Sequence, residues 1–172
     1  MQNKKNSGII YGFLGLFGIF LLTALDQWTK HLAVVHLKAQ NSIELIPGVF
    51  ELQYLENRGA AFGMMQNQQW FFILLTVAYL VAVAVIYFKI PRTKRFFTLH
   101  FLAILLTSGA LGNFIDRVRL QYVVDFFYFE LIDFPIFNVA DIYVTCSMFA
   151  LVFFICFYYK EEELDRVFSR RK

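Results

Sequence analysis

The stretch WFFILLTVAYLVAVAVIYF, residues 70–88, contains 19 consecutive residues without a charge. An α-helix rises about 1.5 Å per residue, so a helix of this length crosses the roughly 30 Å hydrocarbon core of a bilayer. Three further uncharged stretches have comparable length, at residues 8–25, 96–115 and 142–159. Because helices satisfy their own backbone hydrogen bonds in lipid, the sequence predicts an all-α membrane protein with four transmembrane helices.

The basic residues are distributed unevenly among the segments between these helices. The two ends of the chain and the connection 89–95 carry 11 of the 16 Lys and Arg residues. Lys and Arg concentrate on the cytoplasmic side of membrane proteins. We therefore expect a single integral membrane domain over residues 1–172, with both termini cytoplasmic and the connections 26–69 and 116–141 on the outer side. The net charge of +3 then reflects topology and contacts with membrane lipids, and nothing indicates a nucleic-acid partner.

The outer connections contain strand-like segments. SIELI at 42–46 and VFELQYL at 49–55 flank Pro47-Gly48, a pair that suits the centre of a type II turn. The aromatic run 122–129 is expected to pair with these strands. The sequence thus predicts a small extracytoplasmic β-sheet element beside the four helices, and residues 57–70 are expected to include a short interfacial helix.

Polar side chains gather at the outer ends of all four predicted helices. They are Asp26, Gln27, Thr29 and Lys30 after the first, Asn57 and Arg58 before the second, Asn113, Asp116 and Arg117 at the end of the third, and Asp125, Asn138 and Asp141 before the fourth. Ionisable residues at membrane depth are costly, and most are paired or functional. The pattern indicates one polar layer at the outer membrane surface.

Asp125 and Asp141 are the residues of this layer with the clearest chemistry. Asp141 lies near the first turn of the fourth helix, where a carboxylate also serves as a cap. Asp125 lies within VVDFF, and a carboxylate among Val and Phe loses solvation, which raises its pKa unless a partner compensates. Two carboxylates that share one proton can activate water and protonate a departing amine. The chemistry implied is aspartic-type hydrolysis.

Other members of the polar layer have structural alternatives. Asp26 and Lys30 are spaced i, i+4 and either form an interfacial salt bridge or support the site. Arg117 either extends to lipid phosphates or serves the site, and Asn113 is expected to bond a neighbouring helix or strand.

The remaining reactive side chains are expected to be structural or solvated. Glu130 and Asp133 are expected to face solvent. Cys146 and Cys156 are expected to be buried in the fourth helix without a redox role. His100 lacks a neighbouring ligand, so neither a metal nor an organic cofactor is expected.

Five sequence blocks resemble those of a known family. They are DQWTK at 26–30, NRGAAF at 57–62, GALGNFIDR at 109–117, VVDF at 123–126 and FNVAD at 137–141. In this order and at these topological positions, they resemble the bacterial lipoprotein signal peptidases, or signal peptidase II family, across essentially the whole chain.

The resemblance implies a membrane-embedded aspartic endopeptidase. Such an enzyme removes signal peptides from diacylglyceryl-modified prolipoproteins by cleaving before the lipidated cysteine. It lies in the bacterial cytoplasmic (inner) membrane, has its active site at the extracytoplasmic face and is inhibited by globomycin. By motif position, Asp125 and Asp141 match the catalytic dyad. The residues expected to bind substrate or support the site are Asp26, Lys30, Asn57, Arg58, Gly59, Gly109, Asn113, Asp116, Arg117, Asn138 and Ala140.

One position next to the dyad departs from the family pattern. Ile142 follows Asp141 where a small hydroxyl residue is common. A hydrogen bond to Asp141 is then either missing or supplied elsewhere, by Tyr143 or Asn138.

Two other classes of function remain open from the residues alone. A proton or ion carrier would use membrane carboxylates as a relay, but its acids would be spread across the depth of the bilayer. A non-catalytic assembly or lipid-binding protein would use the same polar layer only to join the helices to the outer strands. Release of a free signal peptide from a lipidated precursor distinguishes the peptidase from both.

Overall fold

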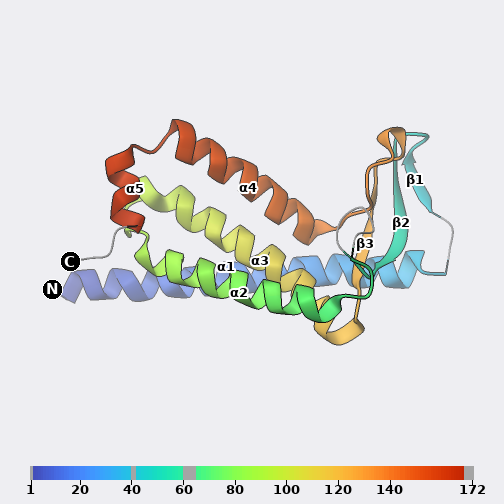
Figure 1. The fold of residues 1–172 in the computed structure, drawn as a ribbon, viewed down its shortest axis with the longest axis horizontal. Helices are drawn as coiled ribbons and strands as arrows, with labels where there is room; N and C mark the ends of the chain where they lie inside the picture. The colour runs from blue at the N-terminus through green and yellow to red at the C-terminus, as the bar shows by residue number, and fades with distance from the viewer. Residues whose placement is uncertain (1, 40–41, 60–64, 169–172) are drawn as a thin grey trace.

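The computed structural model describes residues 2–39, 42–59 and 65–168. Four long helices run side by side, and a small sheet crosses one end of them (Figure 1). The helices are α1 (Gln2–Leu37), α2 (Gln69–Lys89), α3 (Phe97–Leu120) and α4 (Val139–Phe157). All four are long and apolar enough to cross a membrane, as the sequence predicted. A short helix, α5 (Glu161–Phe168), lies at the end of the bundle opposite the sheet.

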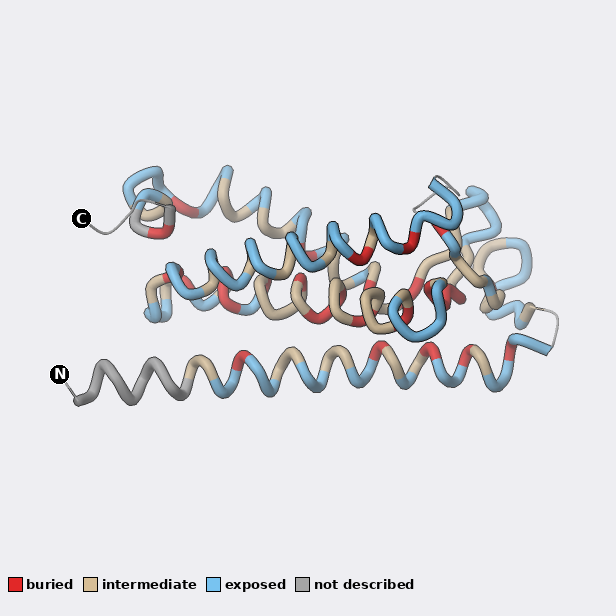
Figure 2. Tube along the Cα trace, turned by 60° about the horizontal axis from the view of Figure 1, so that its bottom comes forward, coloured by how far each residue is buried: buried red, intermediate tan, exposed pale blue. Residues whose placement is uncertain are grey.

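Helix α3 is the centre of the bundle. It packs against α1, α2 and α4, and it is the most buried of the four helices. The outward faces of the other helices remain exposed, whereas buried residues lie along α3 and toward the sheet (Figure 2). Exposed apolar faces are expected of helices whose solvent is lipid.

The sheet has the antiparallel order β1 (Ile43–Ile46), β2 (Phe50–Asn57) and β3 (Val123–Tyr128), which confirms the predicted strands. Gly48 adopts a φ of 68° and Val49 N–H donates to Ile46 O at 3.0 Å, as a type II turn requires. A short 3₁₀ helix, η3 (Glu130–Ile132), follows β3.

A bulge in β2 decides which of its side chains face the same side as Asp125. Leu52 pairs with Phe127, but Leu55 pairs with Asp125, so β2 contains one extra residue over this interval. The extra residue moves Leu55 and Asn57 to the face that carries Asp125. Without it, Tyr54 and Glu56 would occupy that face instead.

The ends of three helices differ from the prediction. α1 was expected to end at residue 25 but continues to Leu37, and α3 continues from the expected residue 115 to Leu120. The charged residues that suggested a boundary are paired inside the protein, as described below, so they do not interrupt the helices. α4 begins at Val139 rather than 142, because Asn138 and Asp141 form a capping box around its first turn. The outer connections are correspondingly shorter than 26–69 and 116–141.

The interfacial helix expected within 57–70 lies partly outside the described residues. Residues 65–67 form a turn in which Met65 and Asn67 have positive φ. Residues 60–64 are not described.

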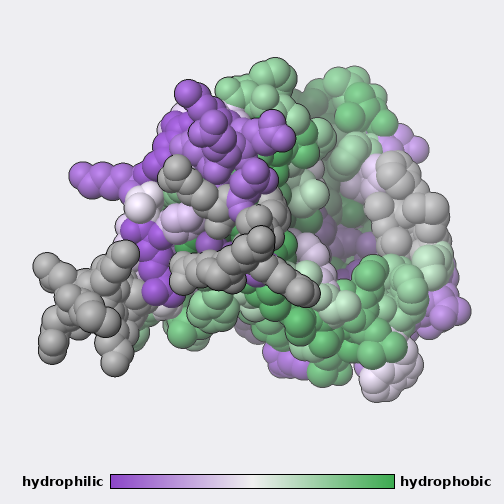
Figure 3. Space-filling view, turned by 60° about the vertical axis from the view of Figure 1, so that its left-hand side comes forward, coloured by the Kyte–Doolittle hydropathy of each residue, from purple (hydrophilic) through white to green (hydrophobic). Residues whose placement is uncertain are grey.

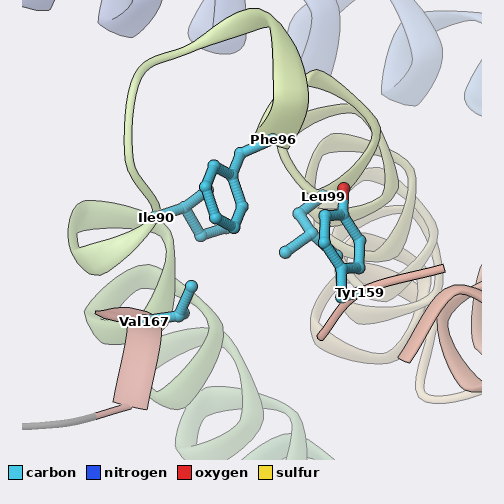
Figure 4. Close-up of a cluster of buried hydrophobic side chains, with 5 residues drawn as sticks. All are labelled: Ile90, Phe96, Leu99, Tyr159 and Val167. Carbon is cyan, nitrogen blue, oxygen red and sulfur yellow. The ribbon is translucent and has the colours of Figure 1, made fainter. Parts of the chain in front are cut away.

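The helix α5 was not predicted. Its residue Val167 packs with Ile90, Phe96, Leu99 and Tyr159 at the end of the bundle away from the sheet (Figure 4). Arg95 lies in the 3₁₀ helix η2 (Lys94–Phe96) and forms an ion pair with Glu163 of α5 at 2.9 Å. Only eight residues long and acidic at its start, α5 depends on these tertiary contacts for stability.

Candidate active site

Asp125 and Asp141 lie on either side of Asn138. The Asn138 side chain donates from Nδ2 to Asp125 Oδ1 at 2.6 Å, and the Asn138 backbone N–H donates to Asp141 Oδ2 at 3.1 Å. Both aspartates line one cavity of about 710 Å³. Asp125 lies in β3 and is only 1% exposed. Asp141 lies in α4. The fold thus brings the two predicted acids together.

Each aspartate also accepts a hydrogen bond from a further asparagine. Asn57 Nδ2 donates to Asp125 Oδ2 at 2.8 Å, and Asn113 Nδ2 donates to Asp141 Oδ1 at 2.7 Å. Gly59 N–H donates to Asn57 Oδ1 at 3.0 Å, which orients the amide so that its NH₂ group faces Asp125. The amide groups therefore fix both carboxylates from several sides.

A buried ion cluster of Asp26, Lys30 and Asp116 is linked to the aspartate pair through Asn113. Lys30 Nζ lies 3.0 Å from Asp26 Oδ2 and 3.0 Å from Asp116 Oδ2, and it donates to Asn113 Oδ1 at 2.8 Å. The predicted Asp26–Lys30 pair is therefore formed, and both side chains are buried inside the protein. Through Asn113, the Lys30 ammonium also fixes the amide that binds Asp141.

The two acids of the ion cluster hold neighbouring elements in place. Asp26 Oδ1 accepts the backbone N–H of Ala140 at 2.9 Å, which joins α1 to the start of α4. Asp116 Oδ2 accepts the backbone N–H of Val124 at 3.2 Å, which fixes β3 next to Asp125. Both acids thus position the strand and the helix that carry the pair.

Glycines of α3 allow the close approach that this arrangement needs. A Cβ at Gly109 would lie 2.5 Å from Ala140 O and 2.7 Å from Val144 Cγ2. A Cβ at Gly112 would collide with the Asp26 carboxylate and lie 3.2 Å from Ala140 Cβ. Only residues without a Cβ fit at these two positions.

Replacing Gly112 by Ala is expected to destabilise the protein by about 1–3 kcal/mol, the usual cost of inserting a methyl group into a packed interior. Cleavage activity should fall as well, because the methyl displaces Asp26 and with it the start of α4. Thermal unfolding in detergent and a cleavage assay measure the two effects.

The matched control is Gly12→Ala in α1, where an added Cβ meets nothing within 4 Å. Alanine is the better helix former, so this change should be neutral or stabilising by up to about 1 kcal/mol. Equal behaviour of the two variants would contradict the packing argument.

The cavity is lined by both polar and apolar residues. Asn57, Asn113 and Arg117 are among the polar ones, and Phe134, Ile136 and Ile142 are among the apolar ones. A site of this kind can hold a polar peptide group beside an apolar group.

The two arginines of the predicted site have different surroundings. Arg117 lines the cavity, with its guanidinium 5.0 Å from the centre of the Phe72 ring. Arg58 is exposed, pairs with Glu56 at 2.9 Å and lies over the Tyr122 ring. Arg58 O accepts the N–H of Asn67 at 2.8 Å, so the residue holds the adjoining loop rather than contacting the aspartates.

Burial changes the acid strength of Asp125. Loss of solvation raises the pKa of the Asp125 carboxyl from its ordinary 3.8 to about 7, and the nearby charge of Asp141 acts in the same direction. Hydrogen bonds from Asn57 and Asn138 oppose this shift. Asp125 is therefore suited to hold a proton at neutral pH.

Asp141 lies in the first turn of α4, where the helix dipole favours a negative charge. It is the third residue of α4, and its Oδ2 accepts an N–H at the helix N-terminus. The Ile142 side chain cannot donate a hydrogen bond to Asp141, and the backbone N–H of Asn138 donates one instead. The Tyr143 hydroxyl has no hydrogen-bond partner among the described residues.

Two supporting residues were not assigned a role from sequence. Gln27 Nε2 donates to Asp116 Oδ1 at 2.9 Å and to Gly112 O at 3.1 Å. Gly112 lies beside Asp26, as described above. The spacing of Gly109 and Gly112 on one helix is the signal that could have identified the close helix contact.

The remaining reactive side chains differ in part from expectation. Glu130 and Asp133 are exposed, as expected, and Asp133 Oδ1 accepts the Tyr128 hydroxyl at 2.7 Å. Cys146 and Cys156 are exposed rather than buried, because they lie on the outward face of α4, and Cys146 also borders the cavity. Among the described residues, no group of three or more His, Cys, Asp or Glu side chains is placed to hold a metal ion.

Similar sequences are found among lipoprotein signal peptidases. The family described as signal peptidase (SPase) II, Peptidase_A8, matches residues 18–157. A lipoprotein signal peptidase of Streptococcus thermophilus (strain CNRZ 1066) is 46% identical over 144 residues, which cover 84% of this chain and 91% of that protein. One from Streptococcus pyogenes serotype M5 (strain Manfredo) is 43% identical over 150 residues, covering 87% and 95%.

Solved structures of similar fold are also found. A bacterial membrane enzyme determined by the in meso method at 2.3 Å resolution aligns with a TM-score of 0.76 at 29% identity, covering 92% of this chain and 93% of that chain. A second, determined at 1.9 Å resolution, aligns with a TM-score of 0.71 at 31% identity, covering 85% and 94%. The chain is therefore a multi-pass membrane protein that belongs to the signal peptidase II family, the A8 family of aspartic peptidases that remove signal peptides from prolipoproteins.

Proposed function

We propose that Asp125 and Asp141 are the catalytic pair of this peptidase and that its substrates are prolipoproteins whose cysteine already carries a diacylglyceryl group. The observation that carries the proposal is the shared cavity in which Asn138 binds both carboxylates. Asn57, Gly59, Asn113, Asn138 and Arg117 surround the pair. The Asp26–Lys30–Asp116 cluster, with Gly109 and Ala140, holds the elements that carry it.

In this mechanism, Asp141 is the base. Ionised Asp141 accepts a proton from water, and the water oxygen bonds to the carbonyl carbon that precedes the modified cysteine. Its position at the N-terminus of α4 supports the charged form.

Asp125 is the acid in the same mechanism. Its protonated carboxyl hydrogen-bonds the carbonyl oxygen and gives its proton to the nitrogen as the C–N bond breaks. The products are a free signal peptide with a new carboxyl end and a lipoprotein with a new amino end. The pair holds one proton at the start, two in the intermediate and one at the end, when the proton is on Asp141 and Asp125 is ionised, and the two carboxylates titrate together.

The physical properties of the substrate support a site at the outer membrane surface. Withdrawing two acyl chains into water costs about 0.8 kcal/mol per CH₂, on the order of 20 kcal/mol for a lipid-sized pair. The scissile bond must therefore be cleaved next to the headgroups. The basic connection 89–95 lies at the end of the bundle opposite the sheet. Because Lys and Arg concentrate on the cytoplasmic side, this supports cytoplasmic termini and an extracytoplasmic site within a single membrane unit.

Incubation of the purified protein with a lipidated precursor tests this function. Release of free signal peptide is expected, and a precursor with Ser in place of the modified Cys should not be cleaved. Globomycin is expected to block the reaction. Cleavage of the unlipidated precursor at an equal rate would contradict the proposed substrate class.

The cleavage rate should decrease as the pH rises through about 7. The reaction needs the protonated form of Asp125, and its pKa of about 7 means that this form is lost above that pH. The dependence of kcat/KM on pH between 5.5 and 9 measures the effect. A rate that keeps increasing to pH 9 would show that cleavage does not need a proton on Asp125.

A further inference from the structure

Arg117 carries the only positive charge among the described residues that line the catalytic cavity. The Lys30 ammonium does not line the cavity, and it is already paired with Asp26 and Asp116 at 3.0 Å each. Arg117, by contrast, forms no ion pair with any residue that the structure describes. The cavity therefore contains a cation whose capacity to bind an anion is not used by the surrounding side chains.

The hydrogen-bond donors of Arg117 are also largely unused. Nη1 donates to the Asn113 backbone oxygen at 3.4 Å, which is long for a hydrogen bond. Nε is buried and has no hydrogen-bond partner within the described part of the chain. The guanidinium lies over the Phe72 ring, 5.0 Å from the ring centre. This cation–π contact holds the side chain in place without using any of its five N–H groups.

The position of Arg117 on α3 places it beside the aspartate pair. It lies one turn after Asn113, whose amide binds Asp141. The charges of Asp141 and Asp125 both act on the guanidinium, although neither carboxylate forms an ion pair with it. A further anion that forms next to the two aspartates would therefore meet a nearby cation without having to displace a bound partner.

Peptide cleavage in this cavity produces such an anion. The signal peptide gains a new α-carboxyl group, whose ordinary pKa of about 3.3–3.7 means that it is ionised at neutral pH. A buried charge is costly unless an opposite charge or hydrogen-bond donors compensate it. Seen from the end of the bundle away from the sheet, hydrophobic surface covers much of the helices, and such a surface offers no compensation (Figure 3).

We propose that Arg117 binds the carboxylate of the cleaved signal peptide and that this product consequently inhibits the enzyme. The inference rests on the proposed function and extends it to the step after the C–N bond has broken. A planar guanidinium can donate two parallel hydrogen bonds to a carboxylate. Because the peptide bond of the substrate carries no charge, this attraction arises only after cleavage, so Arg117 distinguishes the product from the substrate.

The charge contact is tested with the full-length enzyme in detergent and two synthetic signal peptides that end at the residue before the cysteine. One peptide has a free carboxylate and the other a carboxamide, and each competes with cleavage of the lipidated precursor. The assay is run at pH 6, below the Asp125 pKa of about 7, so that the aspartate pair repels the acid peptide less. For the unchanged enzyme, the Ki of the acid should be about tenfold lower than that of the amide.

Substitution of Arg117 tests the assigned partner of the carboxylate. In Arg117→Met, the two Ki values should agree within about twofold, because the carboxylate loses its counter-charge. Arg117→Lys keeps the charge but loses the planar fork, so a difference of about threefold should remain. Equilibrium binding of the two peptides, each labelled with a fluorophore, gives the same ratio for a variant that cleaves too slowly to assay.

The matched control is Arg119→Met on the same helix. Arg119 is exposed and does not line the cavity. Its replacement should leave the tenfold difference between the acid and the amide unchanged, because the charge of an exposed side chain is screened by solvent.

Three results would overturn the inference. They are equal Ki values for the acid and the amide with the unchanged enzyme, a tenfold difference that persists in Arg117→Met, and loss of the difference in Arg119→Met as well as in Arg117→Met. The second result would mean that Arg117 does not bind the carboxylate, and the third that only the overall charge matters. Failure of the proposed function is distinguishable, because the unchanged enzyme would then not cleave the lipidated precursor.

Discussion

Replacing Asp125 by Asn is expected to reduce kcat/KM for a lipidated precursor by about 10³–10⁴-fold, because the amide cannot supply the proton that the leaving amine needs. The protein should remain folded. Because the pKa of Asp125 is raised from 3.8 to about 7 in the folded protein, this carboxyl lowers the stability of the fold as the pH rises from 3.8 to about 7, and the neutral amide removes that loss. A lost hydrogen bond of about 1 kcal/mol opposes this gain. Cleavage kinetics and thermal unfolding in detergent measure both effects, and Asp141→Asn should lose activity to the same extent.

The control for this prediction is Glu130→Gln. Glu130 is an exposed acid of the same outer segment and does not line the cavity. Its replacement should leave kcat/KM within about twofold, as is usual for a solvated surface group. Normal cleavage by the purified Asp125→Asn or Asp141→Asn protein would refute the proposed pair.

Replacing Lys30 by Met is expected to lower the free energy of unfolding by about 3–5 kcal/mol, because two carboxylates then stay buried without their counter-charge. Lys30 is 3% exposed and lies 3.0 Å from both Asp26 and Asp116. Activity should also fall, since Asn113 loses the ammonium that orients it toward Asp141. Denaturant or thermal unfolding in micelles gives the change in stability.

Lys38, the residue directly after the end of α1, serves as the comparison. Lys38 pairs with Glu56 at 3.0 Å, but its side chain is 49% exposed. Exposed pairs of this kind contribute up to about 1 kcal/mol, so Lys38→Met should change stability by no more than that. If both lysine variants unfold at the same denaturant concentration, the buried cluster does not stabilise the fold as described.

The four helices could be predicted because lipid imposes a simple requirement on sequence. Residues 70–88 had to be uncharged and about 20 residues long, and the observed α2 differs from the prediction by one residue at each end. Pro47-Gly48 likewise fixed the turn between β1 and β2, because Gly48 adopts the positive φ that the second central position requires.

The helix ends and α5 could not be predicted, because they depend on partners far away in the chain. Asp26 and Lys30 looked like the end of a transmembrane helix. α1 continues through them because Asp116 and the Ala140 N–H satisfy them from α3 and α4. Similarly, residues 161–168 are too short and acidic to indicate a stable helix, and α5 is held by Arg95 and the apolar cluster around Val167.

By itself, the sequence determined the class of protein, the number of candidate spans and the strands, and it predicted the two aspartates, because hydrophobic length, turn residues and motifs are local properties. Only the tertiary structure decided that Asp125 and Asp141 share one cavity and that Asn57 reaches Asp125. The β2 bulge and the close approach of α3 to Ala140 at Gly109 decide these contacts. The bulge and the helix contact both depend on how segments far apart in the sequence pack against each other, and such packing cannot be predicted from a local sequence pattern.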